Sequence, residues 1–224
     1  MKRYEVSGFG VMEYEEVAST NSLAEKLPLS ELKDKQVILT WRQTQGRGQA
    51  TNRWESAPGK NISMTVIFRP ECLEAGKQFA VSMVIALGCL DFLSHYVEGV
   101  TVKWPNDVYV GERKISGILI EHRVAGAHIQ SSLCGIGVNI NQEQFLSPLI
   151  RCLYFNYSVG NFPYRRFWKS CWNVSGRDMN RFIGMPNWKM TFYGICTGLP
   201  EYMILKMNVE SSGLRSEESM NMAS

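Results

Sequence analysis

One short stretch of the chain combines a flexible backbone with cationic, amide and aromatic side chains: Gln43-Thr44-Gln45-Gly46-Arg47-Gly48-Gln49-Ala50-Thr51-Asn52-Arg53-Trp54. Its two glycines let the backbone approach a ligand closely. Peptide N–H groups and the guanidiniums of Arg47 and Arg53 can therefore surround an anion such as a phosphate, and Trp54 offers a flat face to a purine. The alternative is a solvated surface loop whose glycines serve turn geometry. Neighbouring motifs must decide between the two.

A second group of reactive side chains follows at Lys103-Trp104-Pro105-Asn106-Asp107. Pro105 fixes a bend, so that Lys103 and Asp107 can point into one cleft, and Lys114 follows in the next turn. Two lysines facing a carboxylate suit a site for a phosphorylated or acyl-activated intermediate, with the lysines on the anion and Asp107 near an amine or Mg²⁺. The alternative is a surface ion pair between Lys103 and Asp107 worth less than about 1 kcal/mol.

Two further polar segments lie at the ends of expected elements. Ser19-Thr20-Asn21-Ser22 starts a helix that Thr20 or Ser22 can cap. This segment is either a plain N-cap or part of a recognition site for a small polar ligand. Near residue 140, the strand Gly135-Ile136-Gly137-Val138-Asn139-Ile140-Asn141 ends in two asparagines that either turn the chain or contact an adenine edge.

Hydrophobic periodicity indicates the elements that must position these groups. Strands are expected at residues 11–17, 37–41 and 62–68, and a long helix at 75–95 with its core face at Phe79, Met83, Ala86, Leu87, Leu90 and Leu93. Strands at 100–104, 108–110, 115–121 and 129–138 follow, with turns at 111–114 and 125–127. The pattern predicts an α+β fold in which helices pack against a mixed or antiparallel sheet.

Composition narrows the function classes. The 224 residues, 45% of them hydrophobic and 20% charged, are typical of a globular domain with a small appendage, and a net charge of +3 gives no argument for a nucleic-acid partner. The six cysteines form no CxxC pair and no zinc-like spacing with the three histidines, so we expect reduced thiols and no metal site. The start of the chain lacks a signal peptide and residues 79–93 are too short to span a bilayer. A cytoplasmic protein without a membrane partner is expected.

The motifs together resemble the catalytic domain of biotin protein ligases, which attach biotin to a lysine of carboxylase carrier domains. The matching segments occur in family order over roughly residues 1–147: Ser19-Thr20-Asn21, Gln43 with Gly46-Arg47-Gly48 and Trp54, Lys103-Trp104-Pro105-Asn106-Asp107, Lys114-Ile115-Ser116-Gly117-Ile118-Leu119-Ile120-Glu121, and Gly135 to Asn141. The resemblance implies a class II synthetase-like catalytic domain.

The resemblance also implies roles for individual residues. Biotin would be held by Ser19, Thr20, Asn21, Gln43, Gly46, Arg47, Gly48 and Lys114. Arg47, Lys103 and Lys114 would neutralise carboxylate and phosphate, Asp107 would face the incoming lysine amine, and the nucleotide would contact Trp54, Asn106 and Asn139. ATP with Mg²⁺ would convert biotin into biotinyl-5′-AMP, shielded from water by the glycine loop, and no tightly bound cofactor is implied.

The implied acceptor is a biotin carboxyl carrier domain, such as that of acetyl-CoA carboxylase, docking along a sheet edge; a homodimer is left open. The chain begins almost directly at the catalytic domain, so neither DNA binding nor a repressor role is expected. One departure is Gln49, which stands where the family often has arginine. Loss of that charge predicts weaker retention of the adenylate.

Residues 148–224 do not fit the small SH3-like domain with which family members generally end. Seven of the chain's 11 methionines and three of its tryptophans lie here without helical or strand periodicity. We expect a frame-shifted or disordered segment, against the alternative of a genuine domain with an aromatic core. The other functions to be weighed are a lipoate–protein ligase, a catalytically impaired biotin-binding relative, and a nucleic-acid-binding module.

Overall fold

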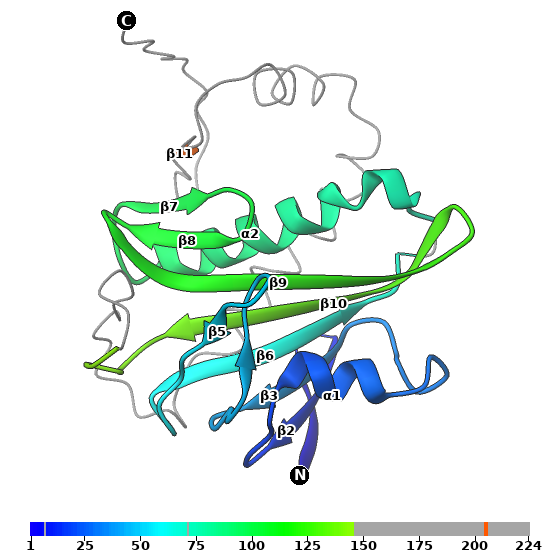
Figure 1. Ribbon diagram of the computed structural model, residues 1–224, viewed down its shortest axis with the longest axis horizontal. Helices are drawn as coiled ribbons and strands as arrows, with labels where there is room; N and C mark the ends of the chain where they lie inside the picture. The colour runs from blue at the N-terminus through cyan, green and yellow to red at the C-terminus, as the bar shows by residue number, and fades with distance from the viewer. Residues whose placement is uncertain (7, 71, 146–203, 206–224) are drawn as a thin grey trace, which may run out of the picture.

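The computed structural model describes residues 1–6, 8–70, 72–145 and 204–205 (Figure 1). In chain order the elements are β1 (Lys2–Val6), β2 (Phe9–Tyr14), α1 (Thr20–Lys26), β3 (Gln36–Thr40), β4 (Gly46–Arg47), β5 (Arg53–Trp54), β6 (Asn61–Phe68), the 3₁₀ turn η1 (Ala75–Lys77), α2 (Phe79–Ser94), β7 (Val100–Lys103), β8 (Asp107–Val110), β9 (Arg113–Ala125), β10 (His128–Asn139) and β11 (Ile204–Leu205).

One mixed sheet organises the described residues. Its nine strands lie in the order β1-β2-β3-β6-β10-β9-β8-β7-β11, and β4 pairs with β5 as a separate small hairpin. The β2–β3 pair is parallel, whereas all the other described pairs are antiparallel. A parallel pair needs a crossover connection, and α1 lies in that connection. The predicted α+β class with a mixed sheet is confirmed.

The two faces of the sheet carry different cores, because successive side chains of a strand point to opposite faces. The larger core packs with α2, and strands of the large sheet contribute alternate residues to it, such as Val37 and Leu39 of β3. The smaller core packs with α1 on the other face and contains Ile38, Ile67 and Leu133. Figure 1 shows α1 in front of the sheet and α2 behind it. The central strand β6 is therefore buried along its whole length, although its sequence alternates as a half-buried strand does.

The long helix differs from its prediction at both its start and its core face. Residues Ala75–Lys77 form the 3₁₀ turn η1, and the α-helix begins at Phe79. Of the predicted core residues, Phe79, Met83 and Leu87 are only partly buried, whereas the buried face is formed by Val81, Val84, Ile85, Ala86, Cys89, Leu90, Phe92 and Leu93. The helix is apolar on almost every side, so periodicity could not orient it. By length and composition alone, Ala75–Ser94 could also cross a membrane, and half of that stretch is buried inside the fold.

The short helix α1 is fixed at both ends. Ser19 is its N-cap, in place of the predicted Thr20 or Ser22, and its side chain accepts a hydrogen bond from the Ser22 N–H at 3.3 Å. At the other end Arg123 of β9 donates to the carbonyl oxygens of Leu27 at 3.1 Å, Ala24 at 3.4 Å, and Glu25. A helix of seven residues is marginal by itself. Its position therefore depends on these contacts.

The remaining strand predictions are confirmed with shifted ends. Strand β1 was missed, and β2 runs from Phe9 to Tyr14 rather than over 11–17. The predicted tail, residues 148–224, lies outside the described residues except for β11, which pairs antiparallel with β7.

Replacing Arg123 with methionine should test the support of α1. The substitution keeps an apolar stem but leaves the carbonyls at the end of α1 without their charged donor. We expect the free energy of unfolding to fall by about 1–2 kcal/mol in chemical denaturation. Arg113→Met, at the exposed first residue of β9, is the matched control and should change it by less than about 0.5 kcal/mol. Equal effects of the two substitutions would contradict this account of Arg123.

Candidate functional site

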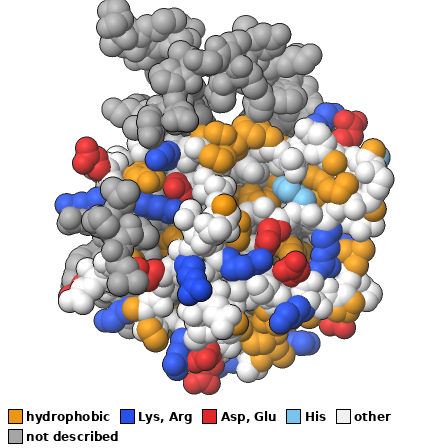
Figure 2. Space-filling model, in the orientation of Figure 1, with side chains coloured by type: hydrophobic (Ala, Val, Ile, Leu, Met, Phe, Trp, Pro, Cys, Tyr) orange, Lys and Arg blue, Asp and Glu red, His pale blue; other side chains and the backbone are white. Residues whose placement is uncertain are grey.

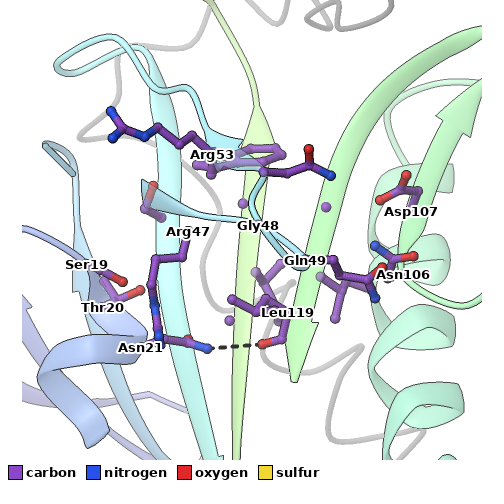
Figure 3. Close-up of a pocket in the computed structure, with 18 of the residues that line it drawn as sticks. Ser19, Thr20, Asn21, Arg47, Gly48, Gln49, Arg53, Asn106, Asp107 and Leu119 are labelled. Carbon is purple, nitrogen blue, oxygen red and sulfur yellow. Dashed lines mark hydrogen bonds between the residues drawn. The ribbon is translucent and has the colours of Figure 1, made fainter. Parts of the chain in front are cut away.

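A cavity of about 290 Å³ lies on the face of the sheet that carries α1. Its floor is formed by β9 and β10, α1 stands at one end, the β7–β8 turn at the other, and the β4–β5 hairpin crosses between them (Figure 3). It brings together most of the residues singled out in the sequence: Ser19, Thr20, Asn21, Gln43, Arg47, Gly48, Gln49, Arg53, Trp54, Lys103, Asn106, Asp107 and Lys114.

The indole of Trp54 lies directly on the sheet over Gly117 and Gly137, which are cross-strand partners in β9 and β10. A Cβ at Gly137 would come within 2.2 Å of the indole Cε2, and one at Gly117 within 2.8 Å of Cζ3. No side chain fits between the ring and the strands at this separation. The indole Nε1 is buried and has no hydrogen-bond partner among the described residues.

The glycine-rich stretch is an ordered hairpin. A Cβ at Gly46 would lie 2.4 Å from the Trp54 carbonyl oxygen, so glycine is needed where β4 meets β5. Gly48 N–H donates to the Asn52 carbonyl at 2.8 Å, and Ala50 at the tip has a φ of 52°. The hairpin lines the cavity with Arg47, Gly48 and Trp54, although most of its residues are also exposed to solvent.

At the α1 end, the uncharged polar residues Ser19, Thr20 and Gln43 line the cavity together with the ion-paired Arg47. Thr20 donates to the Gln43 Oε1 from both its backbone N, at 2.9 Å, and its Oγ1, at 3.3 Å. Because Oε1 is the acceptor of both bonds, the Nε2 group of Gln43 is the hydrogen-bond donor of that side chain. Ser19 both caps the helix and lines the cavity, so the N-cap is confirmed and recognition of a ligand by this segment stays a prediction.

Asn21 is buried in the wall with its amide fully engaged. Thr65 Oγ1 donates to its Oδ1 at 2.6 Å, and its Nδ2 donates to the Leu119 carbonyl at 3.1 Å and to Glu121 Oε2 at 2.8 Å. Its Oδ1 would lie only 2.4 Å from a Cβ at Gly135. In this structure Asn21 shapes the end of the cavity through protein partners.

At the other end a carboxylate meets a lysine. Lys114 Nζ lies 2.7 Å from Asp107 Oδ1, with side chains only 22% and 17% exposed; the contact is an ion pair rather than a well-directed hydrogen bond. Lys103, the cross-strand partner of Asp107, lies with its Nζ 5.6 Å from the ring centre of Tyr109. Burial, reinforced by the Asp107 charge, raises the pKa of Tyr109. The phenol therefore stays neutral beside the ion pair.

Arg47 contacts carboxylates of the protein. Its Nη2 lies 2.6 Å from Glu121 Oε2 and 3.6 Å from Glu25 Oε2. Figure 3 shows its side chain descending from the hairpin toward Asn21. The sequence predicted an anion contact for this guanidinium but did not identify Glu121 as one.

Gly46 and Asn139 are the two predicted site residues that do not line the cavity. Gly46 is buried within the hairpin. Asn139 follows Gly135 and Gly137 on the same face of β10, fully buried, and neither amide atom has a hydrogen-bond partner among the described residues. A buried amide without a partner costs free energy. The hydrogen-bonding capacity of Asn139 is therefore unmet within the described residues.

Sequence reasoning missed the residues beneath the ligand space. Gly117, Gly135 and Gly137 line the cavity, and Thr65 and Glu121 hold Asn21. The available signal was glycine inside a strand pattern, which indicates close approach of another group.

The cavity favours an anion. Its charged lining residues are Arg47, Arg53, Lys103 and Lys114 against the single carboxylate of Asp107. Across the described residues no cluster of three or more His, Cys, Asp or Glu side chains could hold a metal. The described cysteines, Cys72, Cys89 and Cys134, are free thiols, as expected, and burial raises the pKa of Cys89 to about 12.

Substituting Gly137 with alanine should displace the indole. The added methyl group requires Trp54 to leave the floor, so its emission should shift to longer wavelength and the free energy of unfolding should fall by about 1–3 kcal/mol. Fluorescence and chemical denaturation measure the two effects. Gly10→Ala, in a strand position with open space around it, is the control. The emission shift should vanish in a Trp54→Phe background, and its persistence there would contradict the assignment.

Comparison with known proteins was made against families, curated sequences and solved structures. The model of the biotin/lipoate A/B protein ligase family matches residues 14–139. The bifunctional ligase/repressor BirA of Bacillus subtilis is 28% identical over 140 residues, which are 62% of this chain and 43% of that protein. The biotin–[acetyl-CoA-carboxylase] ligase of Paracoccus denitrificans is 32% identical over 124 residues, which are 54% of this chain and 51% of that protein.

A solved biotin protein ligase from Aquifex aeolicus, in complex with biotin and ATP, has a TM-score of 0.60 and 23% identity, covering 77% of this chain and 71% of that chain. At 23% identity, the similarity to this structure supports the fold of the chain alone. The chain spans about half or less of the length of the two curated relatives named above.

Proposed function

The chain belongs to the biotin/lipoate A/B protein ligase family, and from that premise we propose that it is an ATP-dependent biotin–protein ligase. The observation that carries the proposal is one cavity that joins a polar end, formed by Ser19, Thr20 and Gln43 beside the ion-paired Arg47, to a cationic end at Lys103 and Lys114. A ligand with a polar uncharged head and a carboxylate tail fits this order of groups. Biotin has that form, with its ureido ring at the α1 end and its carboxylate toward the lysines.

The first step joins the biotin carboxylate to ATP. A carboxylate oxygen attacks the α-phosphorus, the bond to pyrophosphate breaks, and biotinyl-5′-AMP forms. Lys103 and Lys114 stabilise the negative charge that gathers on the phosphate, and the hairpin keeps water from the mixed anhydride. Gln49 brings no charge to this wall of the cavity, which supports the expectation of weaker adenylate retention.

The nucleotide extends along β10 in this proposal. Adenine lies beside Trp54, and its edge supplies the missing hydrogen-bond partners of Asn139; Asn106 of the β7–β8 turn completes the nucleotide contacts. Asp107 is the only carboxylate among the lining residues, so the cavity offers no cage for Mg²⁺. The ion is expected to enter on the phosphates of ATP.

The second step transfers the biotinyl group to a lysine. The amine nitrogen attacks the acyl carbon, AMP leaves, and an amide forms. With a lysine pKa near 10.4, only about one acceptor amine in 2,500 is unprotonated at pH 7. Asp107 is placed to orient or deprotonate it, and in doing so exchanges its present partner Lys114 for the acceptor amine.

The proposed acceptor is a biotin carboxyl carrier domain, such as that of acetyl-CoA carboxylase. The name of the Paracoccus relative supports this choice. The proposal includes docking of the carrier along a sheet edge and a cytoplasmic location, and it leaves a homodimer open.

The alternative functions receive less support. The family includes lipoate ligases, but the named relatives are biotin ligases; competition between biotin and lipoate for the cavity distinguishes them. For a nucleic-acid binder, a continuous basic surface is expected. Figure 2 instead shows basic and acidic side chains intermingled on one face. An impaired biotin-binding relative would bind biotin without forming the adenylate.

The first half-reaction is tested without an acceptor. Protein, biotin, ATP and Mg²⁺ are incubated, quenched with acid and analysed for biotinyl-5′-AMP by mass spectrometry. We expect the adenylate to form, and Lys114→Ala to lower its rate at least about 100-fold, because a buried charge facing the phosphate is lost. Arg113→Ala, at the exposed neighbouring residue of β9, should leave the rate within about twofold. Biotin binding by calorimetry without adenylate formation would reject the ligase and favour the binding relative.

The second half-reaction is tested with Asp107→Asn. This variant should form biotinyl-5′-AMP but transfer preformed adenylate to a carrier domain about 100-fold more slowly, the scale typical of a lost general base. Its deficit should shrink as the pH rises toward the pKa of the acceptor lysine, since more of the amine is then neutral. An unchanged transfer rate would remove Asp107 from the mechanism while leaving adenylation intact.

A further inference from the structure

We infer that Glu121 is a positioning residue that ties the β4–β5 hairpin to α1 and so sets the size of the cavity at its α1 end. Its effect on catalysis rests on the proposed ligase function, whereas its structural role does not. Glu121 lies on β9, just beyond the lining residues Gly117 and Leu119 on the same face of the strand. No role in binding or chemistry has been derived for it above.

One oxygen of Glu121 serves two donors from different elements. Its Oε2 accepts from Asn21 Nδ2 at 2.8 Å and from Arg47 Nη2 at 2.6 Å. Asn21 belongs to α1 and Arg47 to β4, and both line the cavity. A single carboxylate therefore connects the end wall of the cavity to its cover.

Asn21 is held by this contact together with two others. Thr65 Oγ1 donates to Asn21 Oδ1 at 2.6 Å, so the amide must present its Nδ2 to Leu119 and Glu121. The same amide lies against Gly135 with no room for a side chain. A shift of Glu121 therefore removes one of the two acceptors of Asn21 Nδ2 and at the same time releases Arg47.

Among the described residues, the hairpin's other hydrogen bonds on α1's side lie at its base, where Thr20 of α1 donates to Gln43. Thr44 N–H donates to the Val17 carbonyl at 3.0 Å and Gln45 N–H to the Ala18 carbonyl at 2.7 Å. Beyond these bonds, the Arg47 side chain is the next link toward α1. Glu25, on α1 itself, adds a longer ion pair at 3.6 Å and does not contact Asn21. Glu121 is thus the carboxylate that contacts both Asn21 of α1 and Arg47 of the hairpin.

Limited proteolysis tests the structural role with no ligand added. Trypsin cleavage after Arg53, in the second strand of the hairpin, reports opening of the hairpin, and cleavage after Lys77, in η1, reports opening of the domain. Glu121→Gln keeps the size of the side chain and an acceptor for Asn21 but removes the charge that holds Arg47. We expect the Arg53 cleavage rate to rise roughly three- to tenfold, with Lys77 within about twofold.

Two further variants separate the contacts. Arg47→Met should raise cleavage after Arg53 to a similar extent, because it removes the same link from the hairpin side. Glu25→Gln, which loses only the longer ion pair, should change it by less than about twofold. An unchanged rate in Glu121→Gln or Arg47→Met, an equal effect of Glu25→Gln, or a parallel rise at Lys77 would overturn the inference.

Steady-state kinetics tests the consequence for the site. In Glu121→Gln the KM for biotin should rise about threefold or more while kcat at saturating biotin falls less than about twofold, because the ligand itself re-forms the cover once bound. A fall in kcat with an unchanged KM would overturn the positioning role. If neither the wild type nor any variant forms biotinyl-5′-AMP, the proposed function fails, and proteolysis alone decides the link.

Discussion

The indole of Trp54 and the amide of Asn21 lie directly on the backbone of β9 and β10, and this contact requires strand residues without side chains. Gly117, Gly135 and Gly137 meet that requirement, with virtual Cβ positions between 2.2 and 2.8 Å from the groups above them. Glycine inside a strand lowers the stability of that strand. Here the destabilised strands are β9 and β10, which make the most extensive pairing in the sheet. Because these glycines carry no side chains, the hairpin can lie close against the two strands and cover the cavity.

The charges of the site are arranged in two opposed groups. At the β7–β8 end, Asp107 and Lys114 form a mostly buried pair, in which removal of either partner leaves a charge with poor solvation. At the α1 end, Arg47 faces Glu121 and Glu25. Arg47 and Lys114 each already have a carboxylate partner in the protein. A bound anion therefore competes with those carboxylates, which limits how tightly the cationic residues hold it and favours its later release.

Much of the architecture could be predicted from the sequence. The strands from Val37 onward and the order of the motifs follow from period-two patterns and from a specific resemblance, and the predicted residues meet in one cavity with two exceptions, Gly46 and Asn139. The orientation of α2 could not be predicted, because its apolar residues surround the axis. The role of Glu121 could not be predicted either, because its partners Asn21 and Arg47 are distant in the sequence and only the folded sheet brings them together.

The contacts of Asn21 with Leu119 and Glu121 join residues 98 and 100 positions apart. The helix and the glycine hairpin are made early during synthesis, but their floor, β9 and β10, is made last among the strands of the cavity. Such distant contacts must close a long loop before they stabilise anything. A ribosome-bound chain of about the first hundred residues therefore holds the recognition groups without a floor to align them, and the ability to bind a ligand arrives only once β10 has emerged.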